Sequence, residues 1–200
     1  MIEVVLFDFD GVLCYDRFYQ EMLLPQHQEL FDWIQNNIFS NKDLFHQWMR
    51  GKVSTKDINK IISESTNQTE EFLNEVLMKS LQKIRLDGKM LNFAKGLRKN
   101  FGKKIGIITD NVDVFSTVIA KNHKLDDVFD VITNSADYGC LKIEQRGKLF
   151  DEALKTLNKK IGNTFFIDNT VEKVDFFKQK GGQGFLYNNN LEELSNLLRL

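Results

Sequence analysis

The feature that most constrains this chain is an apolar run near its start that ends in two aspartates. Residues 4–7 read Val-Val-Leu-Phe, and Asp8 and Asp10 follow, with Gly11 directly after them. A short apolar run of this kind is typical of a strand buried on both faces of a parallel sheet. Because an ionised carboxylate is costly to bury unless it is paired or bound to a metal, the two aspartates predict a ligand site, with a solvated turn as the simpler alternative.

Four later apolar runs predict further strands, at residues 105–108, 128–132, 164–167 and 183–187. Segments with helical spacing of apolar residues lie between them, around 90–101, 112–123, 149–157 and 174–177, and a closing helix is expected at 191–198. Strands that alternate with helices favour an α/β fold with a parallel sheet and right-handed crossovers.

A long stretch without strand-like runs separates the first strand from the others. Between residues 16 and 86, apolar residues recur at helical spacing, which predicts several amphipathic helices. Thr69 precedes one of them as its expected N-cap. We therefore expect an α-helical domain at residues 16–86, inserted into a core formed by residues 1–15 and 87–200.

Composition argues against several classes of partner. The 200 residues carry 27 Lys and Arg against 28 Asp and Glu, so no net field favours nucleic acid or a membrane surface. No apolar stretch approaches the ~20 residues that cross a bilayer. Met1 leads into the first strand without a secretory signal, so a cytoplasmic protein is expected. Cys14 and Cys140 are too few for a disulfide framework or a zinc site and are expected to be buried thiols.

Polar residues follow the predicted strands at corresponding positions. Asp8 and Asp10 end the first strand, Thr109 the second and Asp168 the fourth, and the loop after the third strand carries Lys142. In a parallel sheet these residues share one edge, where such sheets bind ligands. Three carboxylates gathered there would repel one another unless a cation held them, and Mg²⁺ suits this set of oxygens. With the hydroxyl and the lysine they predict a site for a phosphoryl group, in which one carboxylate can be the nucleophile.

These motifs together resemble the haloacid dehalogenase-like hydrolase superfamily. The resemblance extends over nearly the whole chain and is carried by four segments: Asp8-Phe9-Asp10-Gly11-Val12-Leu13, Thr109, Lys142 and Phe165-Phe166-Ile167-Asp168. It implies a Rossmann-like, doubly wound parallel sheet with an inserted α-helical cap, in the phosphatase and phosphoglucomutase-like branch of the family.

The resemblance also implies roles for the two aspartates after the first strand. Asp8 would be the nucleophile, and Asp10 the general acid that protonates the leaving alcohol and later activates water. Mg²⁺ would be held by the carboxylates of Asp8 and Asp168 and by the backbone carbonyl of Asp10. Family dehalogenases lack an acid at the position of Asp10, because a halide leaves without a proton, so Asp10 favours phosphate transfer.

The remaining motif residues would bind the phosphoryl group. Thr109 would donate a hydrogen bond to its oxygens, Lys142 would neutralise its charge, and Asp110 would lie beside it as part of the substrate site. Lys148 is an alternative for the lysine, since the segment after Lys142 looks longer than usual. Asp110 stands where the family often has asparagine, which adds negative charge near the phosphate.

The fourth motif also departs from the family pattern, which commonly has a second acid. Here Asn169 is adjacent to the aspartate, and Glu172 follows, so either of the two would complete the metal site.

The leading hypothesis is a Mg²⁺-dependent phosphatase that cleaves a small phosphorylated metabolite through an aspartyl-phosphate, with the cap closing over the site. The alternatives are a sugar phosphomutase of the same family and a catalytically weak binding or regulatory member. The expected partner is a small-molecule phosphate ester, without nucleic acid or membrane, and the protein is expected to be a monomer or a small homo-oligomer.

Overall fold

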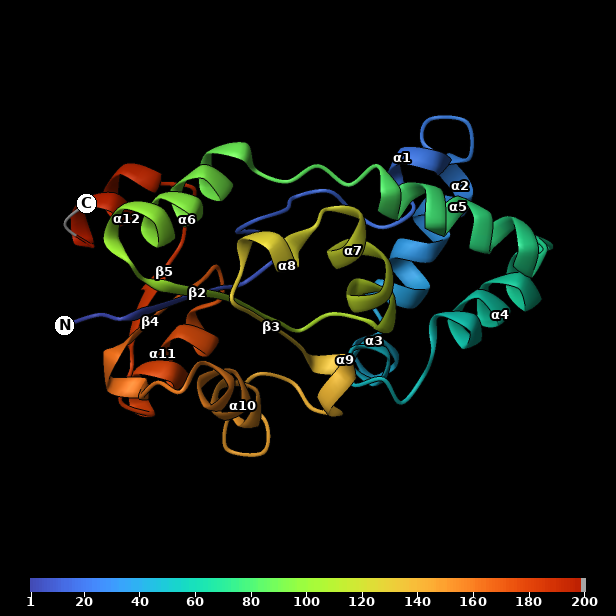
Figure 1. Ribbon diagram of the computed structural model, residues 1–200. Coiled ribbons are helices and arrows are strands. Elements are labelled where there is room, and N and C mark those ends of the chain that lie inside the picture. The colour runs from blue at the N-terminus through green and yellow to red at the C-terminus, as the bar shows by residue number, and fades with distance from the viewer. Residues whose placement is uncertain (199–200) are drawn as a thin grey trace.

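The computed structural model describes residues 1–198 and contains a five-stranded parallel sheet in the order β3-β2-β1-β4-β5 (Figure 1). The strands are β1 (Val4–Phe7), β2 (Lys104–Thr109), β3 (Val131–Asn134), β4 (Thr164–Asp168) and β5 (Gln183–Leu186). Parallel strands connected through helices confirm the predicted α/β fold. The chain builds the sheet outward from β1 to β3 and then returns to the other side of β1, which is the doubly wound pattern.

Strand β1 is the centre of the sheet. All four of its residues are fully buried, and it pairs with β2 on one side and β4 on the other, with Val4 opposite both Lys104 and Thr164. A strand covered on both faces must be apolar throughout, which explains the continuous run in the sequence. Because β1, β2 and β4 are adjacent and parallel, the residues that follow them meet at one edge, which we call the carboxyl edge.

Helices cover both faces of the sheet. On one face α6 (Gly88–Phe101) and α12 (Leu191–Leu197) pack, and on the other α10 (Lys148–Leu157) and α11 (Val171–Gln179), as Figure 1 shows. Alternate residues of β1 point to opposite faces, so that Val5 joins the core under α6, and Leu6 joins a second core under α10 and α11. Phe150, Phe166 and Phe177 fill this second core, with ring centroids 4.7–5.3 Å apart.

The third strand begins later than the sequence predicted. Residues 128–132 were expected to form it, but Val128 ends a short helix, α8 (Leu125–Val128), and β3 runs from Val131 to Asn134. Phe129 packs its ring against Phe7 in the core, and the carboxylate of Asp130 accepts a hydrogen bond from the Ile105 backbone. The apolar run therefore covers the end of a helix and the start of a strand, whose last two residues are buried but polar.

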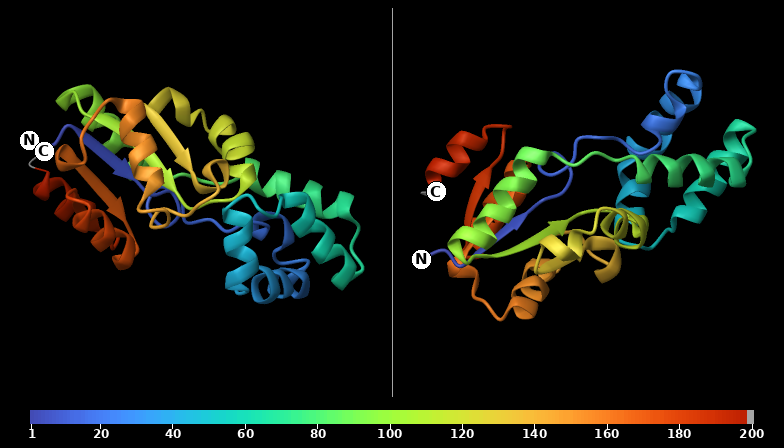
Figure 2. Two further views of the ribbon diagram at one scale, coloured as in Figure 1. Left: turned by 90° about the horizontal axis from the view of Figure 1, so that it is seen from below. Right: turned by 45° about the horizontal axis from the view of Figure 1, so that its top comes forward.

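Between β1 and α6 the described residues form helices joined by loops, beginning with a non-helical segment at residues 8–19. These helices are α1 (Gln20–Leu23), α2 (Gln28–Ile34), the π-helical η1 (Gln35–Phe39), α3 (Lys42–Met49), α4 (Thr55–Thr66) and α5 (Glu70–Gln82), which we call the helical lobe. Ser54 and Thr69 cap α4 and α5 by accepting hydrogen bonds from the backbone N–H of Asp57 and Phe72. Figure 2 shows the lobe beyond one end of the sheet. The exact division into a cap of residues 16–86 and a core stays a prediction.

The two segments that enter and leave the lobe run side by side. The backbone N–H of Asp87 donates to the carbonyl of Leu13 over 2.8 Å. Next to this contact, the Asp16 carboxylate accepts hydrogen bonds from both the backbone and the guanidinium of Arg85. These contacts fix the lobe where it joins the carboxyl edge.

Two further features bear on the expectations from composition. Both cysteines, Cys14 and Cys140, are free and buried. Within residues 1–198, none of the helices has the length and apolar character needed to cross a membrane.

The aromatic core under α10 and α11 gives a test of the packing. Phe150 is fully buried between Phe166 and Phe177, so Phe150→Ala is expected to lower the free energy of unfolding by ~3–5 kcal/mol, through lost burial and the cavity that remains. Phe101 is 47% exposed, and Phe101→Ala is expected to change it by less than ~0.5 kcal/mol. Urea denaturation of the three proteins measures both values, and equal losses would contradict this packing.

Candidate active site

A buried lysine between two carboxylates lies at the centre of the carboxyl edge. The Lys142 Nζ atom is 2.7 Å from an oxygen of Asp8 and 2.7 Å from an oxygen of Asp168. Lys142 and Asp168 are completely buried, and Asp8 is 4% exposed. Lys148, the alternative lysine, instead contacts the carbonyl of Tyr138 over 3.4 Å. The structure therefore brings together Asp8, Lys142 and Asp168 but not Lys148.

The loop after β3 is held in the position that delivers this lysine. Its backbone N–H at Lys142 donates to the carboxylate of Asp110 over 2.7 Å, and its backbone N–H at Leu141 donates to Glu144 over 3.0 Å. The Lys142 ammonium also lies 5.5 Å from the centre of the Phe166 ring, within the range of a cation–π contact. The ammonium thus reaches the two aspartates from a loop that side chains hold firmly.

The charges of the three residues depend on one another. Burial alone would lower the pKa of Lys142, but the charges of Asp8 and Asp168 outweigh it and hold the pKa above its ordinary value. Burial likewise raises the pKa of Asp8, to about 7, against the opposing charge of Lys142. For Asp168, the charges of Lys142 and Lys173 overcome burial and lower the pKa. The two lysines therefore keep Asp168 ionised, whereas Asp8 needs a further positive charge to be fully ionised at neutral pH.

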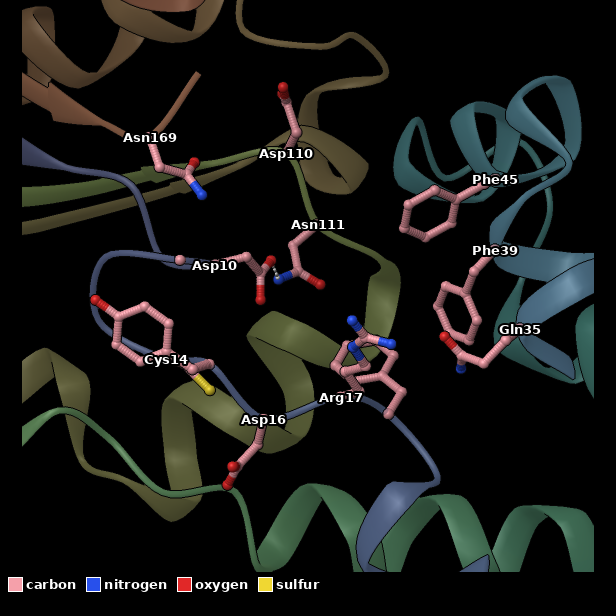
Figure 3. A pocket seen from close by; sticks show the side chains of 13 residues that line it. Asp10, Cys14, Asp16, Arg17, Gln35, Phe39, Phe45, Asp110, Asn111 and Asn169 are labelled. Carbon is pink, nitrogen blue, oxygen red and sulfur yellow. Dashed lines mark hydrogen bonds between the residues drawn. The ribbon is translucent and has the colours of Figure 1, made fainter. Parts of the chain in front are cut away.

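Asp10 faces a cavity and has a partner of its own. Its carboxylate accepts a hydrogen bond of 2.9 Å from the side-chain amide of Asn111, drawn as a dashed line in Figure 3. Asp10 is exposed to solvent within the cavity, yet protein surrounds the cavity, and this desolvation raises the pKa of Asp10 to about 6. A carboxyl group with this pKa exists in both protonation states near neutral pH, as a general acid and base requires.

The turn that carries Asp10 depends on Gly11. The φ angle of Gly11 is 77°, a left-handed conformation, and a Cβ atom there would lie 1.9 Å from the side chain of Asn169. Asn169 therefore packs directly on the first motif, and only glycine leaves room for it. Asn169 and Asp10 line the same cavities, and the predicted part of Asn169 in the metal site stays a prediction.

The Thr109 hydroxyl is buried and lacks a hydrogen-bond partner among the residues that the structure describes. Leaving a buried hydroxyl unpaired costs ~1–3 kcal/mol, so this group suits an acceptor supplied by a ligand. Thr109 ends β2, directly beside β1, whose continuation carries Asp8. The hydroxyl is consistent with its predicted contact to a phosphoryl oxygen.

The extra negative charge of Asp110 is compensated within the protein. One oxygen of its carboxylate accepts from the Lys142 backbone, and the other lies 3.0 Å from Nζ of Lys173. Since protein groups engage both oxygens, Asp110 positions the lysine loop, and its role in substrate binding stays a prediction.

Two residues of the site, Asn111 and Lys173, were not among those predicted. Asn111 closes the polar group after β2, so its place in the sequence was a signal that it shares the edge. Lys173 lies in the first turn of α11, the helix that follows Asp168, and no motif marks it. Only the fold shows that it meets Asp110.

A cleft connects the carboxyl edge to the helical lobe. Its outer cavity, of about 460 Å³, is lined by Asp10, Asp110 and Asn111 on one side and by Gln35, Phe39 and Phe45 of the lobe on the other (Figure 3). An inner hollow of about 430 Å³ is lined by Asp8, Glu172, Lys173 and His46. The two share Asp10, Phe45, Asp110 and Asn169 in their walls, so Asp10 lies where they meet.

A small number of protein oxygen atoms at this edge are suited to bind a hard divalent cation. No three His, Cys, Asp or Glu side chains within residues 1–198 surround a common metal position. The carboxylates of Asp8 and Asp168 come together at Lys142. The Asp10 side chain is hydrogen-bonded to Asn111, so its backbone carbonyl is the oxygen of Asp10 that is available as a metal ligand. Two carboxylates, one carbonyl and several waters suit Mg²⁺. Asn169 and Glu172 both line the inner hollow, so both predicted candidates for the remaining ligand lie at this site.

The lobe is docked against the residues around the cleft. Arg50, at the end of α3, pairs with Glu144 in the lysine loop. The Ser135 hydroxyl donates to the carbonyl of Met49 over 2.6 Å, and the carboxylate of Asp113 accepts from the Trp48 indole over 3.0 Å. The cleft is therefore closed on one side by polar contacts between the lobe and the core.

Comparison with known proteins agrees with this architecture. A family model for haloacid dehalogenase-like hydrolases matches residues 2–181. No curated protein matches the sequence significantly.

Several solved structures resemble the chain at low sequence identity. A HAD (haloacid dehalogenase) family enzyme from Bacteroides thetaiotaomicron is 17% identical over 100% of this chain and 99% of its own, with a TM-score of 0.76, and was also solved in complex with magnesium and inorganic phosphate. A HAD phosphatase from Thermococcus onnurineus is 21% identical over 98% of both chains (TM-score 0.66). The L-2-haloacid dehalogenase from Xanthobacter autotrophicus is 14% identical over 100% of this chain and 83% of its own (TM-score 0.69). Phosphatases and dehalogenases thus share the fold.

The pair between Arg50 and Glu144 predicts a pH dependence of stability. The hydrogen bond from Arg50 lowers the pKa of Glu144 from its ordinary 4.5 to about 2. The pair therefore stabilises the folded protein above pH 4.5, and this contribution is lost as the pH falls from 4.5 toward 2. Because Glu144 is about one-third exposed, we expect Glu144→Gln to cost at most ~1 kcal/mol at neutral pH.

Urea denaturation of the wild type and of Glu144→Gln across this pH range measures the difference. Glu64→Gln is the matched control, since Glu64 lies in an exposed pair with Lys60 within one helix, and its loss is expected to be below ~0.5 kcal/mol. A difference between wild type and Glu144→Gln that persists undiminished at low pH would contradict the assignment.

Proposed function

Since the family model matches almost its whole length, the chain belongs to the haloacid dehalogenase-like hydrolases, and we propose that it is a Mg²⁺-dependent phosphatase acting on a small phosphorylated metabolite. The observation that carries the proposal is the buried ammonium of Lys142 between Asp8 and Asp168. The same edge holds the hydroxyl of Thr109, which has no hydrogen-bond partner within residues 1–198. The ammonium can neutralise a phosphoryl group, the hydroxyl can donate a hydrogen bond to it, and a carboxylate can attack it.

In the first step, an ionised oxygen of Asp8 attacks phosphorus, and the bond between phosphorus and the ester oxygen breaks. The leaving oxygen takes a proton from the carboxyl group of Asp10, so that an alcohol departs and an aspartyl-phosphate remains. In the second step, Asp10 takes a proton from water, the water oxygen attacks phosphorus, and Asp8 leaves with inorganic phosphate as the product. Asp10 thereby returns to its acid form, and the cycle is balanced.

The other residues of the site would stabilise the charge that moves during both steps. Lys142 lies beside Asp8 and neutralises it, and Thr109 would donate to a phosphoryl oxygen. Bound Mg²⁺, held by Asp8, Asp168 and the Asp10 carbonyl, would supply further positive charge and so favour the ionised form of Asp8. Buried charges that are fixed before the reaction need little reorganisation during it.

Asp10 supports a phosphate ester over a haloacid as the substrate. An alcohol leaving group needs a proton, whereas a halide leaves without one. The raised pKa of Asp10 and its position at the junction of the outer cavity and the inner hollow suit a group that gives up a proton there. The structural likeness to a dehalogenase reflects the shared fold, and it does not assign the chemistry.

Substitution of the two aspartates tests the proposal. Asp8→Asn is expected to lower phosphate release on the order of 10³-fold or more, since it removes the nucleophile. Asp10→Asn is expected to cost ~10²–10⁴-fold with alkyl phosphates but much less with p-nitrophenyl phosphate, whose leaving group needs no proton. Phosphate release by each purified variant over a panel of esters measures this.

Asp175→Asn serves as the control, because Asp175 is an exposed residue of α11 that pairs with Lys178 over 3.9 Å. Equal losses of Asp10→Asn with both classes of ester would contradict the role of Asp10. Halide release from 2-haloacids without phosphate release from any ester would overturn the proposed reaction, and interconversion of sugar phosphates with little free phosphate would identify a mutase instead.

Removal of the metal gives an independent test. Chelation of divalent cations is expected to abolish phosphate release, and added Mg²⁺ is expected to restore it. Mg²⁺ is also expected to raise the melting temperature of the wild type, because a ligand that binds only the folded state stabilises it, and to have a smaller effect on Asp168→Asn. Full activity in the presence of a chelator would contradict a metal-dependent mechanism.

A further inference from the structure

The outer cavity contains one charged side chain that has no partner among the residues that the structure describes. Four charged residues line it, namely Asp10, Asp16, Arg17 and Asp110. Asp10 is bonded to Asn111, Asp16 to Arg85, and Asp110 to Lys173 and the lysine loop. The guanidinium of Arg17 makes no hydrogen bond or ion pair with any residue in the described part of the chain, although its backbone carbonyl accepts from Gln20. A guanidinium left free in a cavity whose other charges are paired is available to a ligand.

The position of Arg17 follows from the chain path. Arg17 lies in the segment that leads from β1 to α1, and so enters the cavity where the core meets the lobe. Figure 3 shows its guanidinium on the side of the cavity toward Gln35 and Phe39, across from Asp10 and Asn111. It therefore lies away from Asp8, which lines the inner hollow and not the outer cavity.

This arrangement divides a bound substrate into two parts. Under the proposed function, the phosphoryl group is bound at Asp8 in the inner hollow, and the leaving oxygen lies next to Asp10. The two cavities meet at Asp10, so the rest of the alcohol must extend into the outer cavity. Arg17 is then placed to contact the alcohol part rather than the phosphoryl group.

The remaining walls of the outer cavity are aromatic and amide groups from the lobe. The rings of Phe39 and Phe45 have centroids 5.2 Å apart, and the amide nitrogen of Gln35 is buried without a hydrogen-bond partner in the described residues. The Arg17 guanidinium, which has no side-chain partner in the described residues, faces this wall and suits an oxygen-rich anion. Arginine binds carboxylates and phosphates through two parallel hydrogen bonds, which gives geometric selectivity as well as charge.

We propose that Arg17 selects the substrate, by binding an anionic group, either a carboxylate or a second phosphate, on the alcohol part of the phosphate ester. The inference rests on the proposed phosphatase function and adds the class of substrate to it. The outer cavity, of about 460 Å³, limits this class to small molecules.

Matched pairs of esters test the proposal and distinguish the two anions. The carboxylate arm compares 3-phosphoglycerate with glycerol 3-phosphate, and the phosphate arm compares fructose 1,6-bisphosphate with fructose 6-phosphate. In the wild type, kcat/KM is expected to be higher for the ester that carries the additional carboxylate or phosphate, in at least one pair. In Arg17→Gln, the ratio of the two kcat/KM values is expected to fall at least tenfold, mainly through KM. In Arg17→Lys the ratio is expected to fall less, because lysine keeps the charge but cannot form the bidentate contact.

Arg146→Gln is the matched control, since Arg146 is an exposed arginine that does not line the cleft. The ratio is expected to be unchanged in this variant. A wild type without preference for either anionic ester would overturn the proposal. An equal loss by Arg17→Gln on both members of a pair would also overturn it, because Arg17 would then contact the phosphoryl group itself.

The outcomes separate this proposal from the function on which it rests. If the wild type released phosphate from no ester, including p-nitrophenyl phosphate, the phosphatase function would fail and the substrate class with it. If phosphate were released and the ratio did not depend on Arg17, only the substrate class would fail.

Discussion

The rest of the site depends on the interaction of the buried Lys142 ammonium with the carboxylates of Asp8 and Asp168. Removing an ion from water costs several kcal/mol, and this cost is recovered only if its partners are close and well placed. Asp8 and Asp168 meet that condition at 2.7 Å because Asp8 follows β1 and Asp168 ends β4, and these are adjacent strands of one sheet. The lysine arrives from a third direction, on the loop after β3. The strand order is therefore what allows three segments distant in the sequence to neutralise one another.

Charge balance also explains the departures from the family pattern. An aspartate at position 110 would place a fourth carboxylate at this edge, but Lys173 lies 3.0 Å from it and the lysine loop uses its other oxygen. Lys142 and Lys173 then face Asp8, Asp10, Asp110 and Asp168, which leaves two formal negative charges. This excess supports the proposed divalent cation. An unusual residue in a motif is thus compensated by a residue outside any motif.

The parts of this site that local sequence could predict are those that end strands. Asp8, Thr109 and Asp168 each follow an apolar run, and parallel strands align such ends, so fold and edge could be inferred together. Lys173 and Arg17 could not be found in this way, because their significance depends on partners or cavities made by distant segments. The third strand was misplaced for a related reason: Phe129 is apolar because its ring packs on Phe7, not because it lies in a strand. An apolar run in the sequence indicates that its residues are buried. Whether they lie in a strand, a helix or a loop depends on the tertiary contacts they make.

The lobe is joined to the core by apolar packing as well as by polar contacts. One continuous hydrophobic cluster includes Trp48 and Leu77 from the lobe and Phe9 and Phe115 from the part that contains the sheet. The ring centroids of Phe9 and Phe115 are 4.9 Å apart. Each exposed ion pair is worth ~0–1 kcal/mol, so polar contacts alone would hold the lobe weakly. Buried apolar area contributes ~25 cal/mol per Å² and so gives the lobe a preferred position. The outer cavity has walls from both parts, so this packing sets the position of its two walls. A group held by walls that are already in position needs little ordering to bind.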